Sequence, residues 1–227
     1  MKKKKPLPRI VLAGGTGYIG QELVNLLLDN GYSIICPCRN IKDINKYDLN
    51  HPNLSLINYE NLKETIEKSE FKPSILVSCI ASRSGGIKDS WKVEYDLNME
   101  LLKVANQFQF KKFLLLSAIC VQKPFLEFQR AKLAFENKLQ QSSLPHDIIR
   151  PTAFFKSLSG QIERIKKGKS FFLFGDGKIT SCKPISERDL SRFIKMMIEK
   201  KKSKNGVHII GGPGPSITPK QQGEILF

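Results

Sequence analysis

Residues 9–20 read Arg-Ile-Val-Leu-Ala-Gly-Gly-Thr-Gly-Tyr-Ile-Gly, and this stretch decides the fold. A short apolar run leads directly into a glycine-rich turn, and a helical pattern follows at residues 18–30. Glycines at these spacings permit a tight turn and close approach of the backbone to a pyrophosphate, and the helix start supplies amide donors. The context predicts a dinucleotide-binding turn. Its residues are Gly14, Gly15, Thr16, Gly17, Tyr18, Ile19 and Gly20.

The segments beyond this turn alternate between strand-like and helical patterns. Short apolar runs predict strands at residues 33–36, 55–57, 74–80, 112–117, 146–149 and 207–210. Helical spacing occurs at residues 62–68, 91–109, 125–139, 155–166 and 190–200. Gly31 is placed to end the first helix in the left-handed conformation. The alternation predicts an α/β fold, a doubly wound parallel sheet of the Rossmann type with helices on both faces.

The last quarter of the chain is less regular. Two apolar runs, 171–174 and 179–183, flank Gly175-Asp176-Gly177 and predict a hairpin. Ser186 with Asp189, and Thr218 with Gln221, are typical helix starts. The helix that begins near Thr218 ends after barely two turns at Phe227, which we interpret as a chain cut within a helix. We therefore expect a basic tail at 1–8, an NADP-binding core at 9–168, and a partial substrate-side region at 169–227 interleaved with late core elements.

The residue that ends the second predicted strand indicates which dinucleotide binds. Arg39 stands 19 positions after Gly20. An acidic residue there would accept the adenosine ribose hydroxyls of NAD, whereas an arginine suits the 2′-phosphate of NADP. The alternative is a surface arginine with no ligand. The pattern favours NADPH as the cofactor.

Candidate catalytic residues follow the fifth predicted strand. Ser117 lies at the strand end, where α/β sheets bind ligands. Reductases of this layout carry Tyr-x-x-x-Lys on the next helix, but here the pair is Phe128 and Lys132. These two side chains share one helix face. We expect Lys132 to hydrogen-bond the nicotinamide ribose, and the phenol that would protonate a carbonyl oxygen is missing.

Other candidate site residues follow neighbouring strands. Ser82 belongs to the loop after the fourth strand, and Pro151 and Thr152 follow the sixth, where they would meet the cofactor. Trp91, Phe154 and Phe155 offer apolar surfaces for a flat substrate, as does Phe128, although a simple core role is an equal alternative for the phenylalanines at 154 and 155. The three histidines are scattered, and no metal-binding pattern is present.

Composition excludes several functional classes. The 227 residues carry a net charge of +16, but the lysines lack the aromatic interleaving of RNA-binding surfaces, so nucleic acid is not an expected partner. No run of about 18 apolar residues is present, so we expect at most peripheral membrane contact. No secretory signal is evident at the start. The five cysteines form no Cys-x-x-Cys pair and are expected to be small buried hydrophobes in a reducing compartment.

The chain resembles the atypical short-chain dehydrogenase/reductases, and more narrowly it is similar to the divinyl chlorophyllide a 8-vinyl reductases of photosynthetic organisms. The strings that carry this resemblance are Ala81–Trp91, Leu116–Pro124, Glu127–Lys132, Arg150–Gly160, Cys182–Ser186 and Gly211–Gly214. The resemblance implies NADPH-dependent reduction of the 8-vinyl group of divinyl chlorophyllide or protochlorophyllide to ethyl. It also implies that the protein lies in the cytoplasm, at the thylakoid surface. In a eukaryote it implies the plastid stroma instead. Family members continue beyond Phe227, and that continuation usually closes over the substrate.

Two other functions remain open at this point. A non-catalytic NADP-binding sensor or assembly factor for photosynthetic complexes would also lack the tyrosine. An oxidoreductase of the isoflavone-reductase type would share the fold and the lysine, but it leaves the strings at 81–91 and 117–132 unexplained. The oligomeric state does not follow from the sequence.

Overall fold

The computed structural model describes residues 7–39, 51–70 and 72–226, so most of the predicted basic tail lies outside the described residues. Its centre is a seven-stranded sheet in the order β3-β2-β1-β4-β5-β6-β7, and all neighbouring pairs are parallel. The strands are β1 Ile10–Ala13, β2 Ile34–Cys38, β3 Leu54–Asn58, β4 Ile75–Ser78, β5 Lys112–Leu116, β6 His146–Pro151 and β7 Gly206–Ile210. This confirms the predicted doubly wound Rossmann-type fold.

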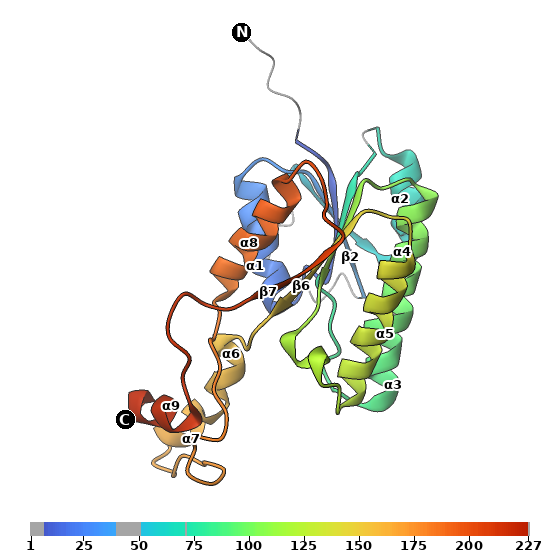
Figure 1. Ribbon diagram of the computed structural model, residues 1–227. Helices are drawn as coiled ribbons and strands as arrows, with labels where there is room; N and C mark the ends of the chain where they lie inside the picture. Colours follow the sequence, from blue (N-terminus) through green and yellow to red (C-terminus); the bar gives the residue numbers. More distant parts are fainter. Residues whose placement is uncertain (1–6, 40–50, 71, 227) are drawn as a thin grey trace.

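Helices cover both faces of the sheet (Figure 1). The elements are α1 Tyr18–Asp29, α2 Leu62–Lys68, α3 Ile87–Ser90, α4 Leu97–Gln107, α5 Glu127–Gln141, α6 Phe155–Leu158, α7 Ile162–Lys166, α8 Glu187–Glu199 and α9 Pro219–Leu226, with short 3-10 segments at Tyr59–Asn61, Ile119–Gln122 and Ser159–Gln161. Helices α1 and α8 lie on one face, and α2, α4 and α5 on the other.

The central strands are buried on both faces, which is why they read as continuous apolar runs. All four residues of β1 are fully buried. Ile10 and Leu12 belong to the core that contains α1 and α8, whereas Val11 and Ala13 belong to the core of α4 and α5. This alternation follows from the two-residue period of a strand, and it holds the turn after β1 at the carboxyl edge of the sheet.

Several local predictions are confirmed. Gly31 has φ +79° after α1. The hydroxyl of Ser186 accepts the amide of Asp189 at 3.0 Å at the start of α8. At the start of α9, the amide of Thr218 donates to the side-chain oxygen of Gln221, and the amide of Gln221 donates to the hydroxyl of Thr218. Each contact supplies a partner to a backbone donor that the helix itself leaves unpaired.

The predicted hairpin around Gly175-Asp176-Gly177 is wrong. Both glycines have positive φ and form a turn, but no strands flank them. Phe172, Phe174 and Ile179 are exposed at 62%, 91% and 77%, so neither flank has an apolar layer to pack against. A hairpin without a buried face is marginal in water, and only an isolated bridge between Cys182 and Ile217 forms.

Two predicted helices are less regular than expected, and only the second is broken. The segment expected as one helix at 91–109 begins with a π-helical turn, Trp91–Asp96, before α4. The segment expected at 155–166 divides into α6 and α7, with a 3-10 turn between them at Gly160. Glycine is a poor residue in a helix interior, which accounts for the break.

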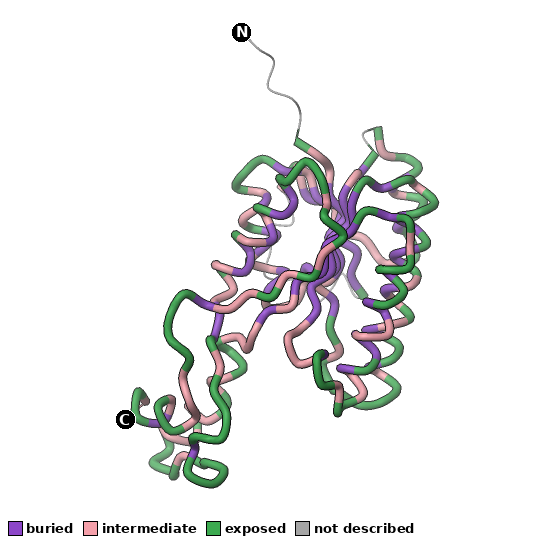
Figure 2. Tube along the Cα trace, in the orientation of Figure 1, coloured by how far each residue is buried: buried purple, intermediate pink, exposed green. Residues whose placement is uncertain are grey.

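Helices α6, α7 and α9 form a lobe set to one side of the sheet (Figures 1 and 2). Its surface is mostly exposed, in contrast to the buried strands. Gly223 of α9 is buried, and a side chain there would meet the ring of Phe171 at 3.1 Å. The side chain of Gln222 donates to the carbonyl of Leu158, which ties α9 to α6. Within the described residues, no helix has the length and apolar character needed to span a membrane.

Candidate functional site

A cavity of about 790 Å³ opens at the carboxyl edge of the sheet. Most of its lining comes from the segments that follow β1, β2, β4, β5 and β6, and Tyr59, Val93, Leu97 and Lys132 complete it. This is the edge at which open parallel sheets bind ligands. The volume falls in the range of cofactor and ligand sites, roughly 300–1,000 Å³.

The glycines of the first turn are required for different reasons. Gly14 has φ +81°, and a side chain there would stand 2.6 Å from the backbone of Cys79. A side chain at Gly20 would stand 2.1 Å from the carbonyl oxygen of Gly14. Gly17 has φ −81°, and its closest neighbour would be the Gly14 oxygen at 3.2 Å. The fold therefore excludes side chains at positions 14 and 20. A side chain at position 17 would instead fill the space in front of the turn.

The N-terminus of α1 is prepared for an anion. Gly17 is its N-cap and supplies no side-chain acceptor, and the first turn contains no acidic residue. The amides of that turn have no partner within the helix, and the helix dipole adds partial positive charge. Thr16, Gly17, Tyr18 and Ile19 line the cavity, as predicted for a phosphate-binding turn.

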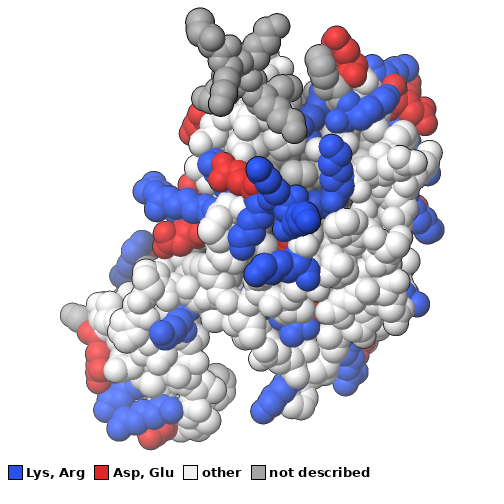
Figure 3. All heavy atoms as spheres, turned by 45° about the horizontal axis from the view of Figure 1, so that its top comes forward, with Lys and Arg blue, Asp and Glu red and all other residues white. Residues whose placement is uncertain are grey.

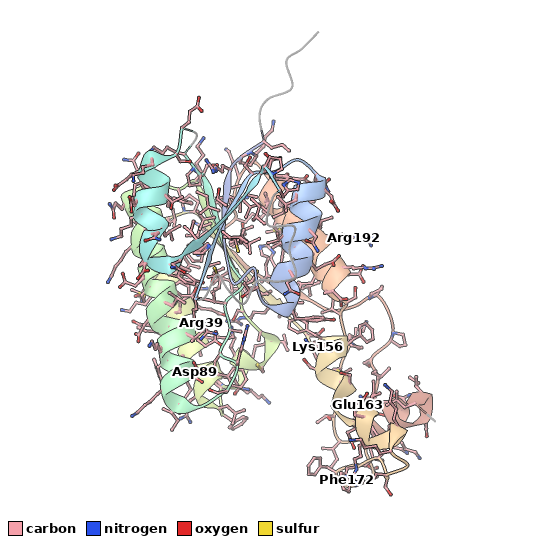
Figure 4. All side chains as sticks on the ribbon, turned by 180° about the vertical axis from the view of Figure 1, so that it is seen from behind. Arg39, Asp89, Lys156, Glu163, Phe172 and Arg192 are labelled. Carbon is pink, nitrogen blue, oxygen red and sulfur yellow. The ribbon has the colours of Figure 1, made fainter. Side chains whose placement is uncertain are left out.

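Two arginine side chains line the cavity. Arg39 is exposed directly after β2 and lines the cavity with Arg83. Asp89 of α3 lies near Arg39 (Figure 4). Hydrogen bonds from the hydroxyls of Ser82 and Ser84 lower the pKa of Asp89, and the charge of Arg39 contributes to the same shift. Ser82 lines the cavity as well.

Ser117 and Lys132 face the same cavity from different elements. Ser117 directly follows β5, and its amide donates to the carbonyl of Ile149 at 2.7 Å. Its hydroxyl is buried and has no hydrogen-bond partner among the residues that the structure describes. A buried hydroxyl without a partner is unfavourable unless a ligand or water supplies one.

Lys132 forms a buried ion pair that the sequence reasoning missed. Its Nζ lies 2.7 Å from Oε2 of Glu94, and the two side chains are 10% and 2% exposed. Glu94 lies in the π-helical turn, 38 positions earlier in the chain, so no local pattern connects it to Lys132. A π-turn inside a helix often marks a functional site, but it has no sequence signature.

The predicted cofactor residues after β6 also line the cavity. Pro151 ends β6, and Thr152 follows it. The Thr152 hydroxyl donates to the carbonyl of Lys183, and its amide donates to Ile210 at 2.9 Å. Both donors of Thr152 are therefore engaged within the protein, and its hydroxyl oxygen and carbonyl are the atoms left to meet a ligand.

Of the four predicted substrate-binding aromatic residues, one lines the cavity and three do not. Phe154 lines the cavity, with its ring centroid 6.3 Å from that of Tyr18. Phe128 is half-buried, Phe155 is 53% exposed, and neither is among the described residues that line the cavity. Trp91 also lies outside that lining: its indole N–H donates to Glu127 at 3.0 Å, and its ring meets Tyr95 edge-on. A substrate role for these three stays a prediction.

Two charged groups surround the phenol of Tyr18. The hydroxyl donates to Glu187 of α8, and Nζ of Lys156 lies 4.8 Å from the ring centroid. Burial, followed by the bond to Glu187, raises the pKa of Tyr18 to about 12. Lys156 lines the cavity from α6 and is exposed, so it places a cation on the side away from Arg39 (Figure 4).

Three cysteines, Cys38, Cys79 and Cys120, also line the cavity, and all are free thiols. Burial raises the pKa of Cys79 to about 12, which keeps its thiol protonated at neutral pH. This agrees with the expected role of cysteine as a small apolar residue. Among the described residues, no group of three or more His, Cys, Asp or Glu side chains is placed to hold a metal ion.

The chain matches, over residues 14–200, a protein family described as NAD(P)H-binding. It is 45% identical over 235 residues to the chloroplastic divinyl chlorophyllide a 8-vinyl-reductase of Arabidopsis thaliana, covering 96% of this chain and 56% of that protein. Identity and coverage are the same for the Cucumis sativus reductase. The chain thus spans about half the length of these curated relatives. The photosystem II assembly factor Ycf39 of Trieres chinensis is 25% identical over 209 residues, 89% of this chain and 63% of that protein.

Solved structures share the fold at low identity. A UDP-glucose 4-epimerase from Thermotoga maritima superposes with a TM-score of 0.79 at 19% identity, covering 96% of this chain and 81% of that one. The Bordetella bronchiseptica enzyme WbmG, crystallised with NAD, superposes with a TM-score of 0.81 at 17% identity, covering 100% and 79%. These likenesses concern the fold alone.

Proposed function

The chain belongs to the NAD(P)H-binding family, and from this premise we propose that it binds NADPH and reduces the 8-vinyl group of divinyl chlorophyllide or protochlorophyllide to an ethyl group. The observation that carries the proposal is 45% identity across 96% of the chain to a divinyl chlorophyllide a 8-vinyl-reductase.

The residues of the cavity fit NAD(P)H. The turn at Gly17 leaves room for a pyrophosphate, and the uncapped start of α1 offers amide donors to it. The buried Ser117 hydroxyl lacks a hydrogen-bond partner among the described residues, and the ammonium of Lys132, which lies 2.7 Å from Glu94, has three donors and so keeps others for a ligand. When bound, the cofactor supplies a hydride. Ser117 and Lys132 then hold and orient it, Lys132 at the ribose of the nicotinamide.

We assign the cofactor as NADPH rather than NADH because of Arg39 and Arg83. Both line the cavity, and Arg39 does so directly after β2, where the adenosine ribose of a dinucleotide lies in this fold. A guanidinium matches a phosphate in charge and geometry. Asp89 near Arg39 is already engaged by two serine hydroxyls, so it orients the loop and leaves the guanidinium facing the cavity.

The absence of the tyrosine agrees with this chemistry. Hydride addition to a vinyl group conjugated to a macrocycle would spread negative charge into that ring and form no alkoxide, and a proton from solvent would then complete the ethyl group. No phenol is therefore needed at the position of Phe128. Catalysis would rest on holding the vinyl group against the nicotinamide in an apolar, water-poor site.

For the substrate side we propose Phe154 and Lys156 as the nearest contacts. Phe154 supplies an apolar surface in the cavity, and Lys156 supplies a cation that suits the carboxylate of a chlorophyllide. Phe155, Phe128 and Trp91 would contribute only where the pigment extends beyond the cavity. Residues 9–168 with the late elements α8 and β7 would hold the cofactor, and the rest of 169–227 would belong to the substrate side.

We further propose that the protein works in the plastid stroma, or in the cytoplasm of a photosynthetic bacterium, with peripheral contact at the thylakoid surface. Relatives at 45% identity are named chloroplastic, which supports the first location. Fractionation of whole cells into plastids and other compartments, followed by detection of the protein with an antibody, would test the assignment in a eukaryote. Recovery outside the plastid would contradict it.

One second candidate has an observation in its favour. Relatives at about a quarter identity are named photosystem II assembly factors, and such a protein would bind NADPH without turning it over. The two functions separate in a single assay. A reductase consumes NADPH only when divinyl pigment is present, whereas an assembly factor binds NADPH and leaves the pigment unchanged.

The decisive experiment is an anaerobic incubation of the protein with NADPH and divinyl chlorophyllide a, with the pigments resolved by chromatography. We expect the monovinyl product to appear and NADPH to be consumed in equal amount. Bound NADPH without product would contradict the reductase and favour the second candidate. Lys132→Met serves as the control, because it should remove product formation.

A further inference from the structure

Glu94 joins two segments of the cavity wall through its two carboxylate oxygens. Oε1 accepts the amide of Ser82 at 2.8 Å, and Oε2 lies 2.7 Å from Nζ of Lys132. The side chain is only 2% exposed. The contact with Lys132 is a close ion pair, and because an ammonium has three N–H donors, the others remain available to a ligand.

The backbone that carries Glu94 is itself held in place. Glu94 lies in the π-helical turn Trp91–Asp96, and its carbonyl accepts the side-chain amide of Asn98 at 2.8 Å. Asn98 in turn accepts the hydroxyl of Ser78 at 2.6 Å, and Ser78 is the last residue of β4. This buried series of contacts runs from the sheet to Glu94. It fixes the carboxylate relative to β4, the strand from which the Ser82 loop begins.

We propose that Glu94 is a positioning residue that sets the place of the Lys132 ammonium and of the Ser82 loop before NADPH binds. Lys132 would meet the nicotinamide ribose and Ser82 the cofactor backbone, so one buried carboxylate aligns two contacts. The role in catalysis rests on the proposed function, whereas the role in cofactor binding does not. Preorganising both contacts lowers the cost of ordering them when the cofactor arrives.

A glutamine at this position cannot do the same. Both oxygens of Glu94 act as acceptors, but an amide group has one acceptor and one donor. In Glu94→Gln, the NH₂ group would face either the Ser82 amide or the Lys132 ammonium, so one contact must be lost. The change is nearly isosteric, which makes the position of the contacts, rather than packing, the quantity that changes.

The chain offers a matched control one helical turn away. Glu136 of α5 is 1% exposed and pairs with Arg150, whose side chain is 15% exposed. Neither Glu136 nor Arg150 lines the cavity. Glu136→Gln therefore breaks a buried ion pair of similar burial on the same helix as Lys132, without touching the cofactor site.

The test is a titration of each variant with NADPH, followed by the fluorescence of the bound cofactor, alongside a thermal melt. Both glutamine variants should lower the melting temperature. Glu94→Gln should also weaken NADPH binding by about tenfold or more, the effect of one hydrogen bond to a charged group. Glu136→Gln should leave that affinity unchanged. Equal affinity of Glu94→Gln and the unmodified protein would overturn the proposal.

A double variant separates positioning from a general loss of packing. Lys132→Gln should weaken NADPH binding, and Glu94→Gln/Lys132→Gln should lose less affinity than the sum of the two single losses, because Glu94 acts in part through Lys132. The double variant also leaves no unpaired buried charge, so it provides a folded reference if a single variant unfolds. Additive losses would contradict the proposal. Since the titration needs no pigment, a protein that fails to reduce divinyl chlorophyllide would refute the proposed function and leave this inference standing.

Discussion

At the scale of single residues, the glycines of the first turn differ in what a side chain at each position would do. Gly17 adopts backbone angles open to any residue, yet a side chain there would enter the space in front of the turn. Gly20 is different, because a side chain would collide with the backbone at 2.1 Å. Gly17 therefore keeps space free for a ligand, whereas Gly20 is required by the fold itself.

We expect Gly17→Val to weaken NADPH binding by at least about a hundredfold by blocking the pyrophosphate, with little change in melting temperature. Gly20→Ala should instead lower the melting temperature. Calorimetric titration and thermal melts of the two variants check this difference. Undiminished NADPH binding by folded Gly17→Val would show that the turn does not hold the pyrophosphate.

Arg39→Glu should weaken NADPH binding by about ten- to a hundredfold, because it removes a charge-assisted contact to the 2′-phosphate, and should affect NADH far less. Competitive titration with both cofactors measures the ratio. Arg192→Glu, on α8 and apart from Arg39 in Figure 4, is the matched charge control. Equal losses for both cofactors would overturn the NADPH assignment.

Lys156→Glu should raise KM for divinyl chlorophyllide by about tenfold, through loss of one carboxylate contact, and should change KM for its methyl ester little. The expected difference arises because only the free acid carries the charge that Lys156 would meet. Lys166→Glu on α7, an exposed lysine outside the cavity lining, is the control. The same rise for acid and ester would contradict the assignment.

At the scale of elements, the edge strand β7 is joined to β6 by a buried carboxylate as well as by the backbone ladder. Asp147 of β6 is 1% exposed, lies 2.8 Å from Nε2 of His208 on β7, and accepts the Ser203 hydroxyl. Burial alone would raise the pKa of Asp147, but the bonds from His208 and Ser203 outweigh it, and the net pKa is lowered. The edge strand therefore depends on the ionised form of this residue.

A lowered pKa in the folded state means that ionised Asp147 stabilises the fold above its unfolded pKa of about 3.9. This contribution should be lost as the pH falls below that value, through the depressed folded pKa. We expect Asp147→Asn to reduce the free energy of unfolding at pH 7 and to flatten the acid limb of the stability curve. Denaturant titrations from pH 2.5 to 7 measure both quantities. An unchanged acid limb would contradict the assignment.

At the scale of the whole molecule, a net charge of +16 accompanies a cavity for an anionic cofactor. Basic side chains are spread over the body and the lobe, with acidic ones between them (Figure 3). The positive electrostatic field of such a protein speeds its encounter with an anion. Salt near physiological concentration screens this field beyond about 8–10 Å. The charge is thus more informative about association rates than about the fold.

The association rate of NADPH should therefore fall as salt rises from about 20 to 500 mM, and it should fall more steeply than that of NADH, which carries less negative charge. The dissociation rate should change little. Stopped-flow fluorescence measures both. Equal salt dependence for the two cofactors would show that the overall charge does not steer binding.

The sequence by itself determined the Rossmann-type sheet, the glycine turn, and the presence of Ser117, Lys132 and Arg39 at one edge. These features depend on local patterns, namely glycine spacing, buried apolar runs and the carboxyl ends of parallel strands, which any α/β chain must express within a few residues. The helix starts at Ser186 and Thr218 were predictable for the same reason, since a cap and its partner are three positions apart.

Only the tertiary structure decided the pairing of Glu94 with Lys132, the separation of Phe154 from Phe128, Phe155 and Trp91, and the absence of a hairpin near Gly175. Each depends on groups far apart in the chain, or on whether a neighbouring layer exists to bury an apolar flank. A carboxylate 38 positions from its lysine leaves no periodic signal, because burial and chain packing, rather than local propensity, bring the two together.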